Sequence, residues 1–289
     1  FTIGFLPGVV DVTWVVSSSR IRVASLRKKN STPGSLLHSS PSHRLSLAAM
    51  RVASRVVVLV RDAAGYGAAL ADALRPSPGL TRVSSPFDLP LDKYGLNGEK
   101  ASGELVSFSD SSGSPQVSFF VLPDYRPPVA ACAMNEILAL ISSEAPSIQP
   151  VLIVPFITRP SGCFHGMVNA TKTGQLTTLH AAEIGASNEF THLLVDGTIK
   201  PPPSLQIRSE PIQCLLEIVR VLKIPTVLLV TSGGQHQGKS SSDSDLEVLQ
   251  CVGDHVAKHI NLEFSKETVI ETGVEKSASI QEPWRELYL

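Results

Sequence analysis

The sequence predicts an α/β fold, with a mainly parallel twisted sheet, helices on both faces and an antiparallel hairpin addition. Three observations lead to this class. An amphipathic helix runs directly into a short aliphatic strand at 209–230. Strand and helix patterns alternate along residues 50–271, as in chains whose parallel strands are joined by crossover helices. Two apolar runs, 104–108 and 116–122, flank a turn-rich segment and predict the hairpin.

The segment 209–230 is the clearest of these patterns. Its apolar residues recur at helical spacing on one face, namely Ile212, Leu215, Leu216, Val219 and Leu222. Ser209 suits the N-cap position, and Pro211 fits the first turn because no N–H is needed there. Pro225 prevents the helix from continuing. The aliphatic run 226–230 then predicts a strand that is buried on both faces.

The remaining elements follow from similar patterns. Strands are predicted at 56–60, 104–108, 116–122, 151–154, 191–195 and 268–270. A short helix is predicted to end at 74, and further helices are predicted at 127–145, at 176–184 and from 243–245 onward. Prolines at positions 76, 78, 86 and 90 predict a loop ahead of the hairpin.

Composition divides the chain into three parts. Residues 1–49 carry six basic side chains and a single acid, Asp11, together with many serines. This leader is predicted to be a disordered extension or a segment outside the functional protein, and an organelle transit peptide is the alternative. Residues 50–271 are predicted to form one α/β domain, and residues 272–289 a flexible C-terminal tether that ends in an apolar tail.

The overall composition is that of an ordinary globular protein. Hydrophobic residues make up 43% and charged residues 18% of the 289 residues. The net charge of −1 gives no electrostatic reason to expect nucleic acid or an acidic membrane as a partner. The four cysteines, at positions 132, 163, 214 and 251, are far apart in sequence, which predicts free thiols in a reducing compartment.

Residues 233–240 match the phosphate-binding P-loop pattern and follow a predicted strand. In such a loop Lys239 would contact the terminal phosphate and Ser240 a magnesium ion, with Asp196 at the end of another strand near the metal. Against this interpretation, two acids follow the loop and the apolar helical period starts only at Leu246. A solvated connector is the preferred interpretation, and a nucleotide-binding protein is the alternative.

Other candidate catalytic or metal-binding groups lack supporting residues. Gly65-Tyr66-Gly67 follows a strand as in dinucleotide-binding turns, but Leu70 occupies the position of the third glycine. The segment 163–165 places a thiol and an imidazole two positions apart, which does not supply the geometry of a catalytic pair. His255 and His259 lie four apart on a predicted helix without an evident third ligand. We therefore predict no catalytic residues, no metal site and no cofactor.

The last three residues, Leu287, Tyr288 and Leu289, differ from the polar ending that is usual for a chain terminus. Tyr288 offers a large amphipathic anchor, and Leu287 can fill an apolar groove. The free carboxylate can pair with a lysine of a partner. We predict that this ending binds another protein.

The helix followed by Lys223-Ile224-Pro225 and an aliphatic strand resembles the corresponding stretch of the proteasome assembly chaperone 1 family. The ending 287–289 is also similar to the hydrophobic–tyrosine–any-residue motif by which this family and other proteins dock onto the proteasome. The resemblance covers residues 50–289. It implies a non-enzymatic chaperone that pairs with proteasome assembly chaperone 2, promotes assembly of the α-subunit ring and inserts its tail into a pocket of that ring. It also implies a cytoplasmic location, with the nucleus as an additional one.

Overall fold

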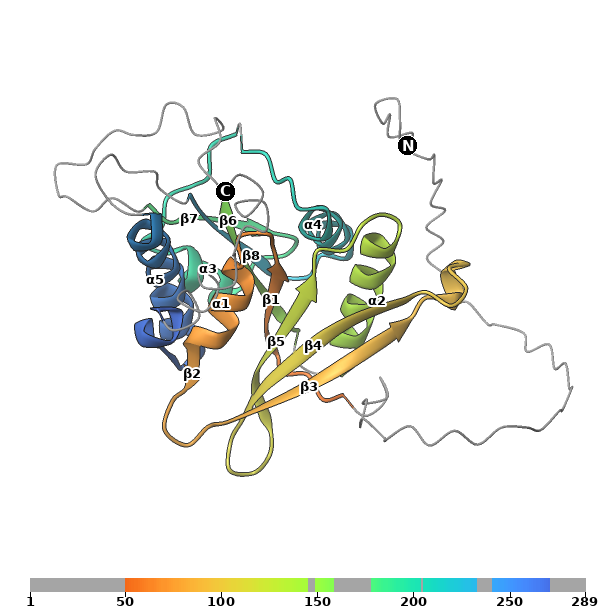
Figure 1. Ribbon diagram of the computed structural model, residues 1–289, viewed down its shortest axis with the longest axis horizontal. Coiled ribbons are helices and arrows are strands. Elements are labelled where there is room, and N and C mark those ends of the chain that lie inside the picture. Colours follow the sequence, from red (N-terminus) through yellow and green to blue (C-terminus); the bar gives the residue numbers. More distant parts are fainter. Residues whose placement is uncertain (1–49, 145–148, 159–177, 204, 233–240, 271–289) are drawn as a thin grey trace, which may run out of the picture. The chain divides into compact units, whose positions relative to one another are not determined.

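The computed structural model describes residues 50–144, 149–158, 178–203, 205–232 and 241–270. All of them belong to the unit His43–Leu289. They form a seven-stranded sheet with helices packed against it, and a separate two-stranded sheet (Figure 1).

Strands and helices alternate along much of the described chain. In order, the elements are β1 (Arg55–Arg61), α1 (Tyr66–Ala73), β2 (Leu74–Pro76), β3 (Thr81–Pro90), the short 3-10 helix η2 (Asp92–Tyr94), β4 (Lys100–Ser109), β5 (Pro115–Pro123), α2 (Val129–Glu144), β6 (Val151–Thr158), β7 (His180–Ile184), α3 (Glu189–Val195), α4 (Glu210–Leu222), β8 (Thr226–Ser232), α5 (Ser241–Ile260) and β9 (Leu262–Phe264).

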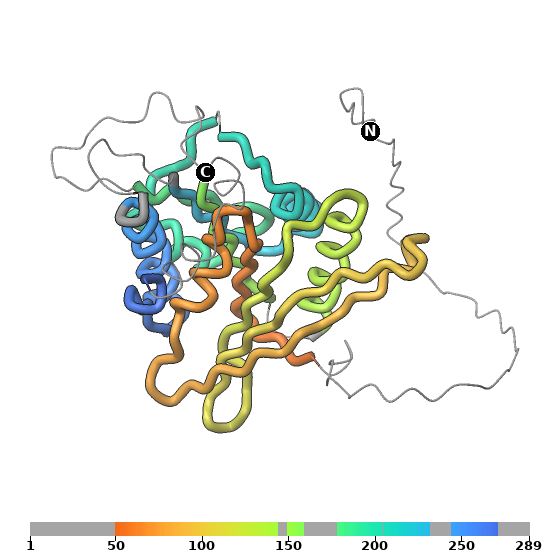
Figure 2. The backbone as a smooth tube through the Cα atoms, viewed as in Figure 1, coloured from red at the N-terminus to blue at the C-terminus, as the bar shows by residue number. Residues whose placement is uncertain are grey.

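The large sheet has the strand order β3-β4-β5-β1-β6-β8-β7. Its central strands β5, β1, β6 and β8 are parallel to one another. β3, β4 and β5 form an antiparallel meander, and β7 runs antiparallel to β8 at the opposite edge. The tube in Figure 2 shows β3 and β4 side by side along their whole length. The predicted class, a mainly parallel sheet with an antiparallel hairpin addition, is confirmed.

Helices cover both faces of this sheet, as the sequence predicted. α2 and α4 pack on one face, and α1, α3 and α5 pack on the other (Figure 1). Alternate residues of β1 supply the two cores, because Val56 and Val58 point to the α2–α4 face while Val57 and Leu59 point to the opposite face. Burial on both faces explains why the central strands are continuous apolar runs.

Two predicted elements are exchanged in type. Residues 180–184 form strand β7 instead of a helix at 176–184, because they pair with β8, which lies far away in sequence. Residues 189–195 form helix α3 instead of a strand at 191–195. Asn188 starts this helix: its Oδ1 accepts from the Thr191 N–H at 2.9 Å, and Thr191 Oγ1 accepts from the Asn188 N–H at 2.9 Å.

Two further parts of the chain differ from the prediction. The strand predicted at 268–270 is wrong, since residues 266–270 are helical. The last described strand is β9, which pairs with β2 in the small sheet. β3 occupies 81–90, where prolines predicted a loop, and its prolines are tolerated because β3 is an edge strand.

Helix α4 confirms the predicted helix at the centre of the sequence pattern, with one difference at each end. Ser209 occupies the N-cap position, but its side chain makes no capping hydrogen bond. At the other end Lys223 adopts a left-handed conformation with φ 55° and ends the helix. None of the helices in the described ranges is long and apolar enough to cross a membrane.

Candidate functional site

The residues that the sequence assigned to partner binding, Leu287, Tyr288 and Leu289, lie outside the described residues. The glycine loop 233–240 and the Cys/His segment 163–165 also lie outside them. Their predicted roles stay predictions.

The elements on either side of the glycine loop bear on the nucleotide-binding alternative. β8 ends at Ser232 and α5 begins at Ser241, so the loop joins a strand to a helix. The helix was predicted to start at 243–245, and its start at Ser241 is earlier than that, which fits a P-loop. Asp196 does not fit one, because it is the C-cap of helix α3 and follows no strand.

His255 and His259 make contacts within the fold. The Nε2–H of His255 donates to the Leu194 carbonyl oxygen at 2.8 Å, and the Nδ1–H of His259 donates to the His255 carbonyl oxygen at 2.7 Å. Burial lowers the pKa of His255 below 6.5, which favours its neutral form. Within the described ranges, no group of three His, Cys, Asp or Glu side chains is placed to hold a metal ion.

A polar cluster of Lys93, Tyr94 and Glu136 joins η2 to α2. The Tyr94 hydroxyl donates to the Glu136 carboxylate, and Lys93 forms an ion pair with the same carboxylate at 2.5 Å. Burial and the hydrogen bond to Glu136 raise the pKa of Tyr94 well above its ordinary value. The cluster keeps a buried carboxylate paired and holds η2 against the helix, which is a structural role.

The sheet splits at the carboxyl ends of β1 and β6. These strands pair from Arg55–Val151 to Val57–Ile153 and then separate. The Val151 N–H faces the β1 side, where it donates to the Ser54 carbonyl oxygen at 2.8 Å. Pro155 lies four residues later with the same orientation and has no N–H to continue the ladder. The split is thus explained by one proline in a central strand.

A cavity of about 30 Å³ lies in this split, between β1, β6 and the N-terminal ends of α1 and α4. Asp62 lines it and accepts a hydrogen bond from the Tyr66 N–H at 3.1 Å. Ser209 also lines it, and its buried Oγ has no hydrogen-bond partner among the described residues. Ligands of α/β sheets commonly bind at the carboxyl ends of the strands. This cavity has room for about two water molecules, so it is too small for a substrate.

Apolar side chains are exposed at the C-terminal end of α4. Val221 is 64% and Leu222 53% exposed, although Leu222 belonged to the predicted buried stripe. We call these two residues the α4 end patch. Glu217 and Arg220, paired at 2.8 Å, lie one turn before it on the same helix. Two exposed apolar side chains are common on protein surfaces and do not by themselves mark an interface.

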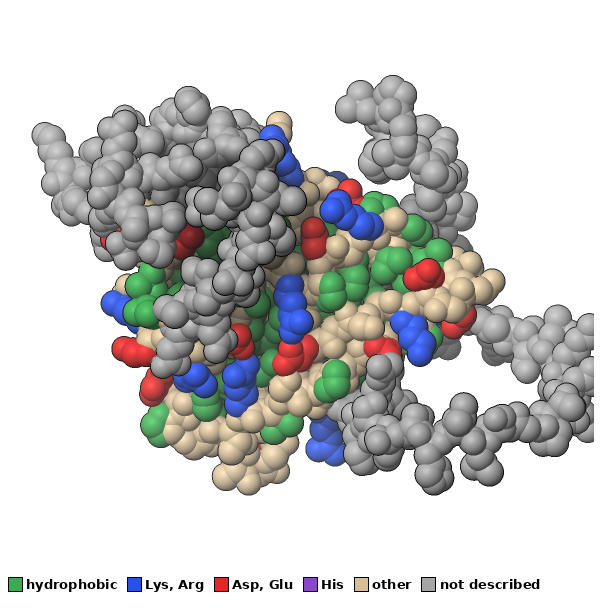
Figure 3. Space-filling model, viewed as in Figure 1, with side chains coloured by type: hydrophobic (Ala, Val, Ile, Leu, Met, Phe, Trp, Pro, Cys, Tyr) green, Lys and Arg blue, Asp and Glu red, His purple; other side chains and the backbone are tan. Residues whose placement is uncertain are grey.

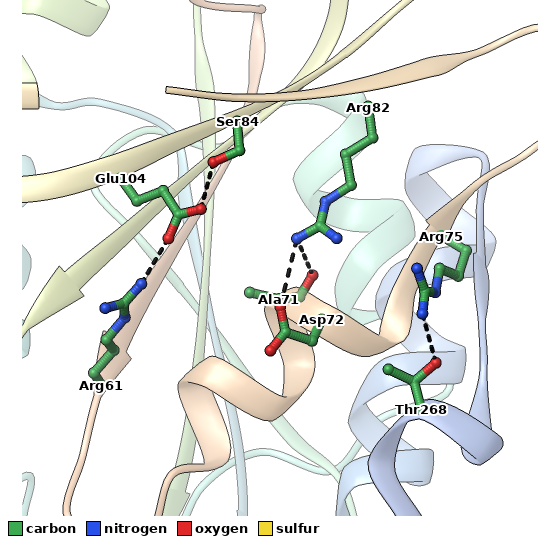
Figure 4. Close-up of polar contacts among 8 residues, drawn as sticks. All are labelled: Arg61, Ala71, Asp72, Arg75, Arg82, Ser84, Glu104 and Thr268. Atoms are coloured by element: carbon green, nitrogen blue, oxygen red, sulfur yellow. Dashed lines mark hydrogen bonds and ion pairs between the residues drawn. The ribbon is translucent and has the colours of Figure 1, made fainter. Parts of the chain in front are cut away.

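Charged side chains of both signs are interspersed over the visible face in Figure 3. Several are paired where α1 meets the β3–β4 hairpin (Figure 4). Arg61 donates to Glu104 at 2.6 Å, and the same carboxylate accepts from the Ser84 hydroxyl. Arg82 reaches across to Asp72 of α1 at 3.5 Å. These contacts tie the hairpin to β1 and α1 and use the arginines internally, so the area does not present free cations to an anion.

No curated protein matches the chain. Similar solved structures include a protein of unknown function from Mycobacterium tuberculosis, with 14% identity, coverage of 86% of this chain and 81% of that chain, and a TM-score of 0.47. PbaB of Pyrococcus furiosus, an archaeal proteasome activator, has 11% identity, coverage of 80% and 93%, and a TM-score of 0.44. PbaA of the same organism, an archaeal homolog of proteasome-assembly chaperone, has 14% identity, coverage of 83% and 97%, and a TM-score of 0.43.

A family model gives the assignment. The model described as "Domain of unknown function (DUF7894)" matches residues 50–289, which include every described element of the fold. The chain therefore belongs to the DUF7894 family.

Proposed function

We propose that this chain is a non-enzymatic proteasome assembly chaperone. In this proposal it pairs with proteasome assembly chaperone 2, promotes assembly of the α-subunit ring and docks Leu287, Tyr288 and Leu289 in a pocket of that ring. Its partners are proteins and include neither nucleic acid nor a membrane, and it acts in the cytoplasm and also in the nucleus.

The observation that carries the proposal is the α4–β8 segment. The stretch whose sequence resembles the chaperone family is built as a helix, a Lys223-Ile224-Pro225 break and a strand. Ile224 is 6% exposed and anchors the break in the core, while the adjoining α4 end patch stays exposed. The helix, break and strand that the resemblance implies are thus present in this order, which supports the proposal.

The chemistry of the tail supports the second half of the proposal. Tyr288 combines a large apolar ring with a hydroxyl, Leu287 is apolar, and the terminal carboxylate is an acceptor for a lysine. Each of these contacts contributes on the order of 1–3 kcal/mol in a buried docking site. Their loss together should weaken binding by two or more orders of magnitude.

The experiment compares α-ring binding by the full chain, by a variant lacking 287–289 and by a variant extended by a few residues after Leu289. Both changes should abolish tight ring binding, since the extension moves the carboxylate out of register. Pairing with proteasome assembly chaperone 2 is measured in parallel and should persist, because it uses the folded domain. Equal ring binding by all three chains would exclude the docking role.

A second candidate function, P-loop nucleotide binding, is favoured by the start of α5 at Ser241, directly after Lys239-Ser240. Asp196 argues against it, because this residue follows helix α3 and does not lie at the end of a strand. Calorimetric titration with magnesium ATP distinguishes the two functions. The chaperone proposal expects no heat of binding, whereas binding that disappears in Lys239→Ala would establish the alternative.

A further inference from the structure

The large sheet has two edges of different kinds. At the β7 edge, Ile199 lies alongside the strand: the Ala181 N–H donates to its carbonyl oxygen at 2.9 Å, and its own N–H donates to Leu179 at 3.1 Å. At the other edge, β3 is the terminal strand, and no described segment is hydrogen-bonded to its outer side. Among the described residues, the β3 edge is therefore the one open to strand addition.

The register of β3 shows which backbone groups point outward. β3 and β4 pair from Thr81–Ser109 to Pro90–Lys100. One step beyond, in the same register, the Leu91 N–H donates to the Glu99 carbonyl oxygen at 3.2 Å. Antiparallel pairs alternate in hydrogen bonding, so odd-numbered residues of β3 bond to β4 and even-numbered residues point their N–H and C=O groups outward.

Prolines divide this outward edge into a closed and an open half. Pro86 and Pro90 are both even-numbered, so the closed half lacks two outward N–H groups. Arg82 and Ser84 keep theirs in the open half. Val83 lies between them with 53% of its surface exposed. An exposed apolar residue flanked by free backbone donors is what strand addition requires.

We propose that two copies of this chain join through residues 81–85 of β3, antiparallel to each other about a two-fold axis at Val83. In this register Arg82 of one copy lies opposite Ser84 of the other. Each of these two pairs exchanges two N–H···O bonds, giving four backbone hydrogen bonds across the axis. Pro86 ends the ladder on each side, so the pairing is self-limited to five residues.

The side chains on both faces fit this arrangement. Arg82 and Ser84 project from the same face of β3 in Figure 4, and the Ser84 hydroxyl is bonded to Glu104. Each Arg82 guanidinium stays bound to Asp72 and to the Ala71 carbonyl oxygen of its own copy. The residue directly opposite it in the second copy is Ser84, which is small and uncharged, so the pairing places no like charges directly opposite each other. On the opposite face, each Val83 packs against Val83 of the second copy and loses its exposure to water.

The resulting dimer has a short interface and is expected to be weak and concentration-dependent. It joins two seven-stranded sheets into one continuous sheet. It is independent of the proposed chaperone function, because it uses neither the α4 end patch nor the tail.

Disulfide trapping provides the first experiment, on the full chain. The two Val83 Cα atoms would be about 4.5 Å apart, as in a non-hydrogen-bonded pair, which a disulfide can bridge. Oxidised glutathione should therefore convert Val83→Cys into a covalent dimer, with release of two glutathione thiols per disulfide. Asp88→Cys and the unsubstituted chain, with its native cysteines, should stay uncrosslinked. Absence of the Val83→Cys dimer, or equal crosslinking of the controls, overturns the proposal.

Sedimentation equilibrium provides a second and independent measurement. Ser84→Pro removes an outward N–H from each copy and leaves the β4 ladder intact, as Pro86 and Pro90 already do. It should raise the dimer dissociation constant at least about ten-fold, because two of the four hydrogen bonds are lost. Asp88→Pro is the matched control, since it lies on the same strand with the same orientation but outside the paired segment. A monomeric unsubstituted chain, or equal effects of the two prolines, contradicts the proposal.

Discussion

Gly67 illustrates, at the residue scale, how closely α1 approaches β1. A Cβ at this position would lie 2.0 Å from the carbonyl oxygen of Val60. At Gly253 of α5 a Cβ would lie 2.1 Å from the ring of Phe264. The obstacle is main chain in the first case and a side chain, which can rotate, in the second.

We expect Gly67→Ala to lower the free energy of unfolding by about 2–4 kcal/mol, because β1 must shift in the centre of the sheet. Gly253→Ala should lose no more than about half as much, since movement of Phe264 and the higher helix propensity of alanine offset the clash. Urea denaturation of both variants checks this order. The reverse order would show that α1 is not held tightly against β1.

His255 is the residue for which the structure predicts a pH effect. Burial lowers its pKa in the folded state, with smaller contributions in the same direction from His259 and Lys258. The unfolded chain therefore binds a proton first as the pH falls, and protonation favours unfolding. The contribution of His255 to stability is present above about pH 6.5 and is lost as the pH falls through the lower folded-state pKa.

Urea unfolding between pH 5 and pH 7.5 measures this effect. The full chain should lose stability toward the acid end of this range, and His255→Gln should lose less, because glutamine can donate to Leu194 but does not titrate. Parallel pH profiles for the two proteins would mean that His255 has the same pKa in the folded and unfolded states.

Helix α3 shows, at the scale of one element, how a cap decides a structure. It has seven residues and contains a β-branched and aliphatic run that resembles a strand. Asn188 and Thr191 exchange hydrogen bonds at its start, and Thr191 also donates to Glu183 of β7. The cap thus both starts the helix and links it to the sheet.

Replacement of Asn188 by alanine should lower the free energy of unfolding by about 1 kcal/mol, the usual effect of losing an N-cap. Asn188→Asp keeps an acceptor at the same position and should stay within a few tenths of a kcal/mol of the unsubstituted chain. Thermal or urea unfolding of the three proteins measures the difference. Equal losses for alanine and aspartate would assign the effect to something other than the cap.

The elements that the sequence predicted correctly are those specified locally. The α4–β8 segment and α2 have apolar spacing and proline breaks that depend on no distant residue. β7 and α3 were exchanged because the partner of β7 is distant in sequence and the cap of α3 outweighs strand propensity. β3 was missed because a proline is compatible with a strand only at an edge, and the edge is known only once the sheet is assembled.

The same distinction applies to the candidate sites. The binding role of the tail 287–289 was predicted from its local chemistry and stays a prediction, because the tail lies outside the described residues. The cavity beside Asp62 and Ser209 could not be predicted, because it arises where two strands separate in three dimensions. The α4 end patch was not predicted, because the helical periodicity assigned Leu222 to the buried stripe. In the structure Leu222 is 53% exposed.

At the scale of the whole molecule, the leader is predicted to be an extension outside the folded domain, and every described residue belongs to the unit His43–Leu289. Removal of 1–42 should therefore leave the thermal midpoint of the remaining chain unchanged within about 2 °C. The cut is placed at His43 because Met50 is 1% exposed, and a new terminal ammonium on a buried residue would be unfavourable. Calorimetry of the full and truncated chains measures the change. A drop of several degrees would show that the removed residues stabilise the domain.

The position of β8 between β6 and β7 has a consequence for synthesis on the ribosome. The meander β3–β4–β5 pairs strands that are consecutive in the chain, so it can assemble as it emerges. β6 and β7 each pair with β8, which is translated only after α3 and α4. A nascent chain that has emerged as far as α4 therefore carries two strands whose common partner has not yet emerged. The arrival of Thr226–Ser232 completes both pairings at once and closes a period in which the aliphatic edge of β6 is open to other chains.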